Sequence, residues 1–305
     1  PLTFVSTNHS ILYENLKPVF ADVDDSLCLD PDSVLKNISD RTRAVIFVGI
    51  GGNLGRLKEI SKICKKHNLR LILDAAHMAG SYTKNSNSEI VHVGKEADVS
   101  VFSFQAVKNL PTADSGMICF KNKKLDSKCR QLSWLGINKD TFARTGKQGE
   151  YKWKYDVPDL GFKYHGNSIM ASIGIVQLKY LAEDNQRRRE LCKIYEQNLN
   201  DTKSLSIISS SPDTAISSRH LFQIIVSDSN SSNLRDILLE YLNSKNIFPG
   251  VHYRINTKYP MYSRAKGNHP NATRMSNSIL SLPLHLNMED EDAIRVSNTI
   301  KEYLL

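Results

Sequence analysis

Apolar and polar residues alternate in blocks along the first two thirds of the chain, and these blocks predict strands and helices in turn. Amphipathic periodicity predicts a helix at 56–68, and a helix at 30–38 is predicted by an Asp followed by a Pro in the first turn. Five short apolar runs predict strands, at residues 18–24, 43–50, 69–76, 98–104 and 116–120. The runs at 43–50 and 69–76 are apolar on both faces, which is typical of parallel strands covered by helices. The pattern therefore predicts an α/β domain with a mostly parallel sheet.

The last third of the chain has a different pattern. A long helix is expected at 167–199, where one face carries Ile169, Ile173, Val176 and Tyr180. A strand at 220–228, a helix at 233–247, and then a short strand and a last helix near the acidic "MEDED" follow. We therefore expect a large domain at 1–184 and a small α+β domain at 185–305, which includes the linking helix.

Composition narrows the class of protein. Of the 305 residues, 40% are hydrophobic and 24% are charged, and no apolar run approaches the roughly 20 residues that span a membrane. The five cysteines are scattered without a CxxC pair, so we expect neither disulfides nor a metal site, and a reducing, cytoplasmic setting fits best. No basic and apolar leader precedes Pro1, so no signal peptide is expected.

The net charge of +8 suggests an anionic partner, either a nucleic acid or a small phosphorylated ligand. The basic runs at 64–70 and 185–190 stand in helical contexts, where solvated helix faces explain them. No zinc-finger or RNP-type motif accompanies them, so we do not expect a nucleic-acid partner.

Polar side chains stand at the carboxyl ends of two predicted strands. Asp74 ends "LRLILD", and Ser103 and Lys108 follow "DVSVF". Ligands of open α/β sheets bind beyond the carboxyl ends of the strands. A carboxylate that follows a buried strand needs a cationic partner. A partly desolvated lysine favours its neutral amine, which is the form that condenses with an aldehyde.

An amine and a carboxylate of this kind are what pyridoxal 5'-phosphate (PLP) requires from a protein. The lysine binds the cofactor covalently, and the carboxylate keeps the pyridine nitrogen protonated. Ser103 is a candidate donor to the cofactor phosphate. A surface lysine that merely reaches from a strand end to water is the alternative for Lys108.

Longer motifs favour the PLP interpretation. The chain contains, in order, "TFVST" (3–7), "KPVFADVD" (17–24), "LDAAHMAG" (73–80), "VFSFQAVKNL" (101–110), "GFKYHGNSIMASI" (161–173), "NQRRRELCKIYEQNL" (185–199) and "SLPLHLNM" (281–288). This order resembles the DegT-type sugar aminotransferases, which are fold type I, aspartate-aminotransferase-like PLP enzymes acting on nucleotide-linked keto-sugars. The resemblance covers essentially the whole chain.

The resemblance implies a role for each matching residue. Lys108 would bind PLP and later carry the proton between the donor Cα and the sugar carbon, and Asp74 would hold the pyridine nitrogen. His77 matches the contact to the ring hydroxyl. Three other positions match further cofactor contacts, one on each ring face and one at the phosphate: Ala76, Phe4 and Ser103.

The resemblance also implies a homodimer with shared active sites. His165 and Asn167 lie in the segment that reaches the neighbouring subunit's cofactor in the family, and either of them is a candidate for that contact. His252 and Tyr253 resemble a small-domain motif near the substrate, with a structural histidine as the alternative. Arg254 and Lys258, which follow Tyr253 in the sequence, would face a diphosphate of the substrate. His220 and His285 are expected to be structural.

Three departures from the family stand out in the sequence. The family has several dozen residues before "TFVST", including a phosphate-binding Gly-Thr turn, so we expect either a fragment or a phosphate site that leans on Ser103 and the other subunit. Gly49 replaces a common histidine, and Gln105 replaces a histidine or tyrosine. The run "TADSG" (112–116) replaces an acidic glycine-rich one. These changes bear on the substrate more than on the reaction.

The predicted function is transfer of an amino group from glutamate to a nucleotide-linked keto-6-deoxysugar, for amino-sugar and polysaccharide biosynthesis. A PLP-dependent sugar dehydratase is one alternative, but those relatives have histidine in place of the lysine, so Lys108 argues against it. A non-catalytic or regulatory homologue of the same fold is the other alternative.

Overall fold

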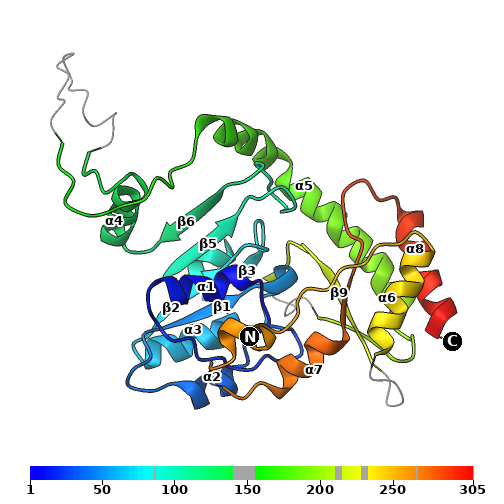
Figure 1. Cartoon of the computed structure of the whole chain (residues 1–305). Helices are drawn as coiled ribbons and strands as arrows, with labels where there is room; N and C mark the ends of the chain where they lie inside the picture. Colours follow the sequence, from blue (N-terminus) through cyan, green and yellow to red (C-terminus); the bar gives the residue numbers. More distant parts are fainter. Residues whose placement is uncertain (86, 140–154, 210–214, 228–232, 266, 305) are drawn as a thin grey trace.

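A computed structural model describes residues 1–85, 87–139, 155–209, 215–227, 233–265 and 267–304. Its central sheet has the strand order β1-β2-β5-β6 (Figure 1). Strands β1 (Ala44–Val48), β2 (Arg70–Asp74) and β5 (Val99–Ser103) are parallel, and β6 (Gly116–Phe120) runs antiparallel at the edge. The predicted α/β class with a mostly parallel sheet is confirmed.

The register of this sheet brings the carboxyl ends of its strands together. Val48 pairs with Asp74, and Asp74 pairs with Val101, two residues before Ser103. Leu73, beside Asp74, is fully buried because the sheet is covered on that side. The polar residues that follow these strands therefore share one edge of the sheet.

The helices beside the sheet form for the reasons that the sequence indicates. In α2 (Pro31–Asn37), the Asp30 carboxylate accepts hydrogen bonds from the amides of Asp32 and Ser33, which is a standard N-cap. In α3 (Leu57–Lys66), the apolar face is buried at Leu57, Ile60 and Cys64. Both predicted helices are confirmed, with ends shifted by one or two residues.

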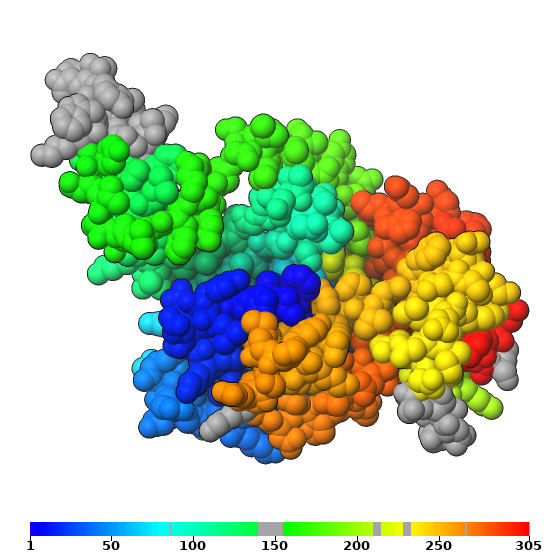
Figure 2. Space-filling model, viewed as in Figure 1, coloured from blue at the N-terminus to red at the C-terminus, as the bar shows by residue number. Residues whose placement is uncertain are grey.

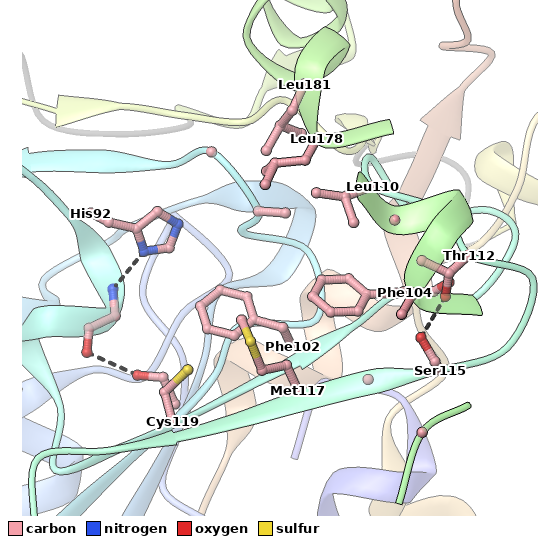
Figure 3. A pocket seen from close by; sticks show the side chains of 18 of the residues that line it. His92, Phe102, Phe104, Leu110, Thr112, Ser115, Met117, Cys119, Leu178 and Leu181 are labelled. Carbon is pink, nitrogen blue, oxygen red and sulfur yellow. Dashed lines mark hydrogen bonds between the residues drawn. The ribbon is translucent and has the colours of Figure 1, made fainter. Parts of the chain in front are cut away.

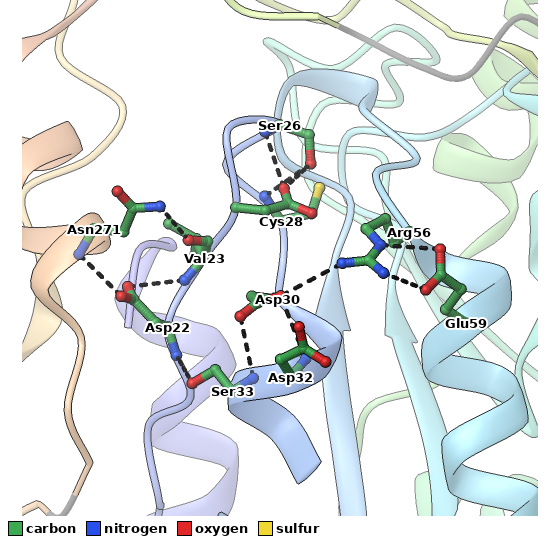
Figure 4. Close-up of polar contacts among 11 residues, drawn as sticks. Asp22, Val23, Ser26, Cys28, Asp30, Asp32, Ser33, Arg56, Glu59 and Asn271 are labelled. Atoms are coloured by element: carbon green, nitrogen blue, oxygen red, sulfur yellow. Dashed lines mark hydrogen bonds and ion pairs between the residues drawn. The ribbon is translucent and has the colours of Figure 1, made fainter. Parts of the chain in front are cut away.

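The strand predicted at 18–24 is wrong. Residues 18–24 belong to none of the sheets that the described residues form, and they carry isolated bridge positions at Val19 and at Val23, which pairs with Leu29. The chain turns back on itself here, since the amide of Asp30 donates to the carbonyl of Asp22. The Asp22 carboxylate accepts from the amides of Asn271 and Ala272 at the start of α7 (Pro270–Ser278), so this segment serves as a helix cap (Figure 4).

The long helix α5 (Ser168–Leu199) runs from the edge of the central sheet to the far end of the molecule (Figure 1). Its C-terminal half is buried at Leu191, Cys192, Tyr195 and Leu199. The apolar face predicted in its N-terminal half is exposed instead, with Ile169 76% and Tyr180 52% accessible. This path is consistent with a helix that connects the two domains. Within the described chain, the apolar face of the N-terminal half of α5 is not covered.

A second hydrophobic core lies around the C-terminal half of α5. It is built on an antiparallel sheet of β10 (Ile279–Leu282), β9 (Phe222–Val226) and β7 (Leu205–Ile207). Helices α6 (Leu234–Ser244) and α8 (Asp290–Leu304) pack with it. The expected small α+β unit has this composition, and the boundary at residue 184 stays a prediction.

Several elements of the structure are not among those predicted from the sequence pattern. They are α1 (Val5–Tyr13), α4 (Lys123–Ser133), α7, and a small sheet of β4 (Ile90–His92), β3 (Tyr82–Lys84) and β8 (Ala215–Ile216). Helix α1 lies against the segment around Asn256, and Asn8 donates to the Asn256 side chain at 2.8 Å. Figure 2 shows these blue and orange segments in contact. No helix in the described ranges is both long and apolar enough to cross a membrane.

Candidate active site

Asp74 and Lys108 come together at the carboxyl edge of the central sheet. Asp74 is the last residue of β2, and Lys108 lies in the loop between β5 and β6. Burial lowers the pKa of the Lys108 amine, and the nearby Asp74 charge acts in the opposite direction. No ion pair in the described part of the chain involves Asp74. The amine is therefore biased toward its neutral, nucleophilic form.

Two uncharged donors hold the Asp74 carboxylate in place. The Thr7 hydroxyl donates to one oxygen at 2.6 Å, and the amide of Ala76 donates to the other at 3.1 Å. Thr7 is buried on α1, and its hydroxyl also lies 3.0 Å from that of Thr3. The carboxylate is oriented without being neutralised, so it can still bind a positive group from a ligand. Thr7 was missed from the sequence, since nothing in "TFVST" marks its hydroxyl as a partner of Asp74.

His77 is a buried, neutral side chain with a fixed tautomer. The amide of Gly51 donates to Nδ1 at 3.1 Å, so Nε2 carries the hydrogen. Burial, together with the Lys108 and His252 charges, lowers the pKa of His77 well below its ordinary value. A Cβ on Gly51 would lie 2.7 Å from Oε1 of Gln223, and its φ of +64° suits glycine. The chain thus presents His77 as a permanent N–H donor at Nε2.

Aromatic rings line the space beside His77. The hydroxyl of Tyr253 is 3.4 Å from His77 Nε2, and the His220 ring lies 4.3 Å from the His77 ring between centroids. Burial, with the Asp74 charge, raises the pKa of Tyr253 to about 12, so its hydroxyl keeps its proton. Phe4 is 57% exposed, with its ring centroid 5.9 Å from that of Tyr253. Tyr253 therefore joins the small-domain segment to this cluster.

Ser103 and Ala76 stand at the same edge. Ser103 ends β5, next to β2, and its hydroxyl accepts a hydrogen bond from the amide of Gln105 at 3.4 Å. Ala76 is half-buried two residues after Asp74. Their positions are compatible with contacts to the cofactor phosphate and ring face, and these two roles remain predictions.

His165 and Asn167 are not part of the cluster. The His165 ring lies 4.1 Å from that of Trp134, and the Asn167 side chain caps α5 by accepting from the Met170 amide. Both residues are exposed. Within the described residues, no hydrogen bond or ring contact connects either of them to Asp74, His77 or Lys108.

The substrate residues predicted in the small domain divide into two groups. His252 is half-buried, its Nδ1 is 2.9 Å from the Ser281 hydroxyl, and burial and the Lys108 charge lower its pKa. Arg254 and Lys258 are exposed instead. Arg254 stacks on Tyr259 at 5.2 Å, and Lys258 donates to the Asn277 side chain at 3.1 Å. His252 thus belongs to the buried cluster, while the two cations lie at its outside.

A cavity of about 1020 Å³ lies beside the Lys108 loop, between β5, β6 and the N-terminal half of α5 (Figure 3). Its wall is mainly apolar and includes Phe102, Phe104, Leu110, Met117, Leu178 and Leu181. Neither Lys108 nor Asp74 lines it. This cavity is therefore separate from the polar cluster that carries the chemistry.

Comparison with known proteins agrees with this arrangement. Residues 1–301 match the DegT/DnrJ/EryC1/StrS aminotransferase family. The chain belongs to this family. It is 31% identical to the spore coat polysaccharide biosynthesis protein SpsC of Bacillus subtilis, over 99% of this chain and 77% of that protein.

Two solved structures extend the comparison. Helicobacter pylori PseC, an aminotransferase involved in pseudoaminic acid biosynthesis, is 26% identical with a TM-score of 0.88, covering 100% of this chain and 78% of PseC. The putative sugar aminotransferase Spr1654 of Streptococcus pneumoniae, in its PLP-form, is 25% identical with a TM-score of 0.87, covering 100% and 80%. The predicted family, PLP-dependent fold and aminotransferase activity are confirmed.

The residues of the cluster fit PLP. When bound, PLP supplies an electrophilic aldehyde and an electron-accepting ring. Lys108 would hold the cofactor covalently, and the oriented carboxylate of Asp74 would hold the pyridinium nitrogen. His77 offers an N–H donor at Nε2 for an oxygen on the ring. The cluster contains an amine with a lowered pKa, an oriented carboxylate and an imidazole with a fixed N–H donor. These are the groups that PLP needs from a protein.

Proposed function

We propose that this aminotransferase moves an amino group from glutamate to the keto carbon of a nucleotide-linked 6-deoxysugar. The observation that carries the proposal is the pair formed by Lys108, with its lowered pKa, and the Asp74 carboxylate, which forms no ion pair among the described residues. A non-catalytic protein that only binds the sugar has no need of a desolvated amine beside such a carboxylate.

The residues divide the work. Lys108 binds the cofactor and then, as a neutral amine, takes the proton from the donor Cα and returns a proton to the sugar carbon. Asp74 would hold the positive charge on the ring nitrogen, and the hydrogen bond from Thr7 fixes the orientation of its carboxylate. His77 and Tyr253 donate hydrogen bonds without changing charge near neutral pH, because burial holds both in their neutral forms.

The relatives and the surface charge support a nucleotide-linked sugar as acceptor. SpsC takes part in polysaccharide biosynthesis, and PseC in pseudoaminic acid biosynthesis. Arg254 and Lys258 are exposed cations four residues apart, next to the Tyr253 segment that enters the cluster. A diphosphate is the substrate group that such cations recognise.

The working unit in this proposal is a homodimer in a reducing, cytoplasmic setting. Apolar side chains gather on the surface before and along the first half of α5, with Leu160 96% and Tyr164 76% exposed. Exposed apolar surface of this extent marks an interaction site. A second copy that covers it would bring His165 or Asn167 to its neighbour's site. All five cysteines are free, which suits a reducing compartment.

The decisive experiment is incubation of the protein with PLP, glutamate and a panel of nucleotide-linked 3-keto and 4-keto-6-deoxysugars, read by mass. We expect an amino-sugar product that gains the nitrogen of 15N-glutamate. The Lys108→Ala variant serves as the control and should give none. A protein that binds the sugars yet forms no amino product would support the regulatory alternative, and loss of the sugar oxygen without gain of nitrogen would support the dehydratase.

A further inference from the structure

Asn109, the residue after Lys108, is held by an unusually complete set of hydrogen bonds. Its side chain is buried, with 7% of its surface exposed. Its Nδ2 donates to Oδ1 of Asn185 at 2.6 Å and to the carbonyl of Ser218 at 2.8 Å. Its Oδ1 lies 2.6 Å from Nδ1 of His220. Both donor hydrogens and the acceptor oxygen of this amide are therefore in use.

Backbone carbonyls fix the direction of each hydrogen bond. The carbonyl of Ser218 can only accept, so the nitrogen of the Asn109 amide must face it. The Asn185 amide is fixed in the same way, because its Nδ2 donates to the carbonyl of Ala79 at 2.9 Å. Oδ1 of Asn109 is thus an acceptor, and Nδ1 of His220 must carry a hydrogen. Burial keeps the His220 ring neutral, which leaves its Nε2 without a hydrogen.

The same network reaches the His77 segment. Ala79 lies two residues after His77, and the Ser218 hydroxyl donates to the carbonyl of His77 at 2.6 Å. The ring centroids of His77 and His220 are 4.3 Å apart, and the ring planes are tilted by 33° to each other. The loop that carries Lys108, through Asn109, and the turn that carries His77 are therefore anchored to the same three residues: Asn185, Ser218 and His220.

We propose that Asn109 and His220 act as positioning residues, which hold the Lys108 loop at a fixed place relative to His77. The proposal rests on the proposed role of Lys108. Between Ser103 and Gly116 the Lys108 loop has no strand or helix to hold it. Backbone hydrogen bonds such as the one from the Thr112 amide to the Phe104 carbonyl join residues within the loop, whereas the Asn109 side chain ties the loop to other segments. His220 contributes its Nδ1 hydrogen to this anchor, which is a role beyond the structural one that the sequence predicts.

A matched pair of variants tests the hydrogen bond. Leu and Asn have nearly the same shape, but only Asn can donate from the position of His220 Nδ1. We expect His220→Leu to lower kcat roughly ten- to hundredfold with little change in the KM for glutamate, because a misplaced amine slows proton transfer. His220→Asn should recover most of this loss.

The second readout needs neither substrate nor turnover. In the protein freed of PLP, hydrogen exchange of the backbone at 104–113 should rise in His220→Leu and return toward the wild-type rate in His220→Asn. The rate at which PLP alone attaches to Lys108 should follow the same order. A protein that fails to act on any sugar but shows this order would contradict the proposed substrate and leave the positioning role supported.

Equal losses in His220→Leu and His220→Asn would overturn the proposal, since they would assign the effect to the ring and not to its hydrogen bond. If His220→Leu does not fold, Asn109→Asp tests the same anchor from the loop side. This variant keeps the size of the side chain but cannot donate to the Ser218 carbonyl when ionised. Wild-type exchange and attachment rates in a folded Asn109→Asp variant would also overturn the proposal.

Discussion

The two sides of the Lys108 loop differ sharply. One side presents Lys108 and Asn109 to a polar cluster, in which the Asn109 amide is bound by residues of the same chain and burial lowers the pKa of the Lys108 amine. The other side presents Phe104, Leu110 and Thr112 to an apolar cavity of about 1020 Å³. The arrangement of the polar side is determined by contacts between residues of this chain. The second side lies beside the exposed half of α5, whose apolar face lacks cover within the described chain.

This contrast separates chemistry from assembly. Hydrogen bonds and charges on the polar side fix protonation states and directions, which a reaction requires. Apolar surface on the cavity side fixes no direction, but it stabilises whatever covers it by about 25 cal/mol for each Å² removed from water. Variants on the two sides should therefore fail in different ways.

The largest expected effect comes from Lys108→Ala on the polar side. Turnover should fall by about a thousandfold or more, because the variant has neither the covalent link nor the proton carrier. In the wild-type protein, borohydride reduction followed by peptide mapping should place the PLP label on Lys108. The control is Lys121→Ala, since Lys121 lines the cavity, and it should keep its label and activity. A label on any residue other than Lys108 would break the assignment.

Asp74→Asn should lower turnover by roughly a hundredfold, because a neutral amide no longer keeps the ring nitrogen protonated. The Asp74 charge raises the pKa of Lys108, so its removal should lower that pKa further. The pH midpoint for attachment of PLP should therefore move to lower pH, as measured by absorbance of the bound cofactor. Asp98→Asn, which alters a carboxylate lining the cavity, is the control. An unchanged midpoint and near-normal turnover would make Asp74 a structural carboxylate.

Mixed dimers connect the two sides of the comparison. A chain with Lys108→Ala, paired with a chain altered at both His165 and Asn167, should regain up to about half of the wild-type activity, because one of the two sites in each mixed dimer is intact. Dimers are prepared with two different tags and assayed after isolation of the mixed species. Dimers shown to be mixed that recover nothing would argue against a contribution across subunits.

A charged side chain introduced on the apolar side of the loop should weaken the dimer before it affects the catalytic reaction. Ile175→Lys, at a residue 65% exposed on α5 that also lines the cavity, should weaken the dimer by roughly tenfold or more in Kd, because a lysine is costly to bury at an interface core. Sedimentation velocity over a range of concentrations measures this. Leu286→Lys, at an exposed apolar residue that does not line the cavity, is the matched control. A dimer of unchanged affinity would place the interface on another surface.

The smallest effect is expected outside the cluster, at Arg254 and Lys258. Arg254→Ala or Lys258→Ala should raise the KM for the nucleotide sugar severalfold and leave kcat nearly unchanged, as loss of uniform binding predicts. Arg274→Ala, a cation near Asp25, is the control, and steady-state kinetics with varied sugar gives the answer. Equal kinetics in all three variants would remove these cations from the substrate site.

The sequence was sufficient to predict the central sheet and the chemistry at its edge. Doubly apolar strands and polar residues at their ends are local signals, so Asp74, Ser103 and Lys108 could be placed without a structure. Thr7, Asn109 and the Gly51 amide could not, since the partners that matter to the site lie 26 to 111 residues away in the chain. Residues 18–24 have the apolar composition of a strand, but in the structure the Asp22 carboxylate of this segment caps α7.

The buried imidazoles have a consequence for the folded state in acid. Burial lowers the pKa values of His77, His220 and His252, so the native protein leaves all three unprotonated where an unfolded chain would bind protons. Stability is therefore fully kept above the ordinary histidine pKa of about 6.5 and decreases as the pH falls below it. The arrangement that gives the enzyme a constant set of donors near neutral pH also makes its fold acid-labile.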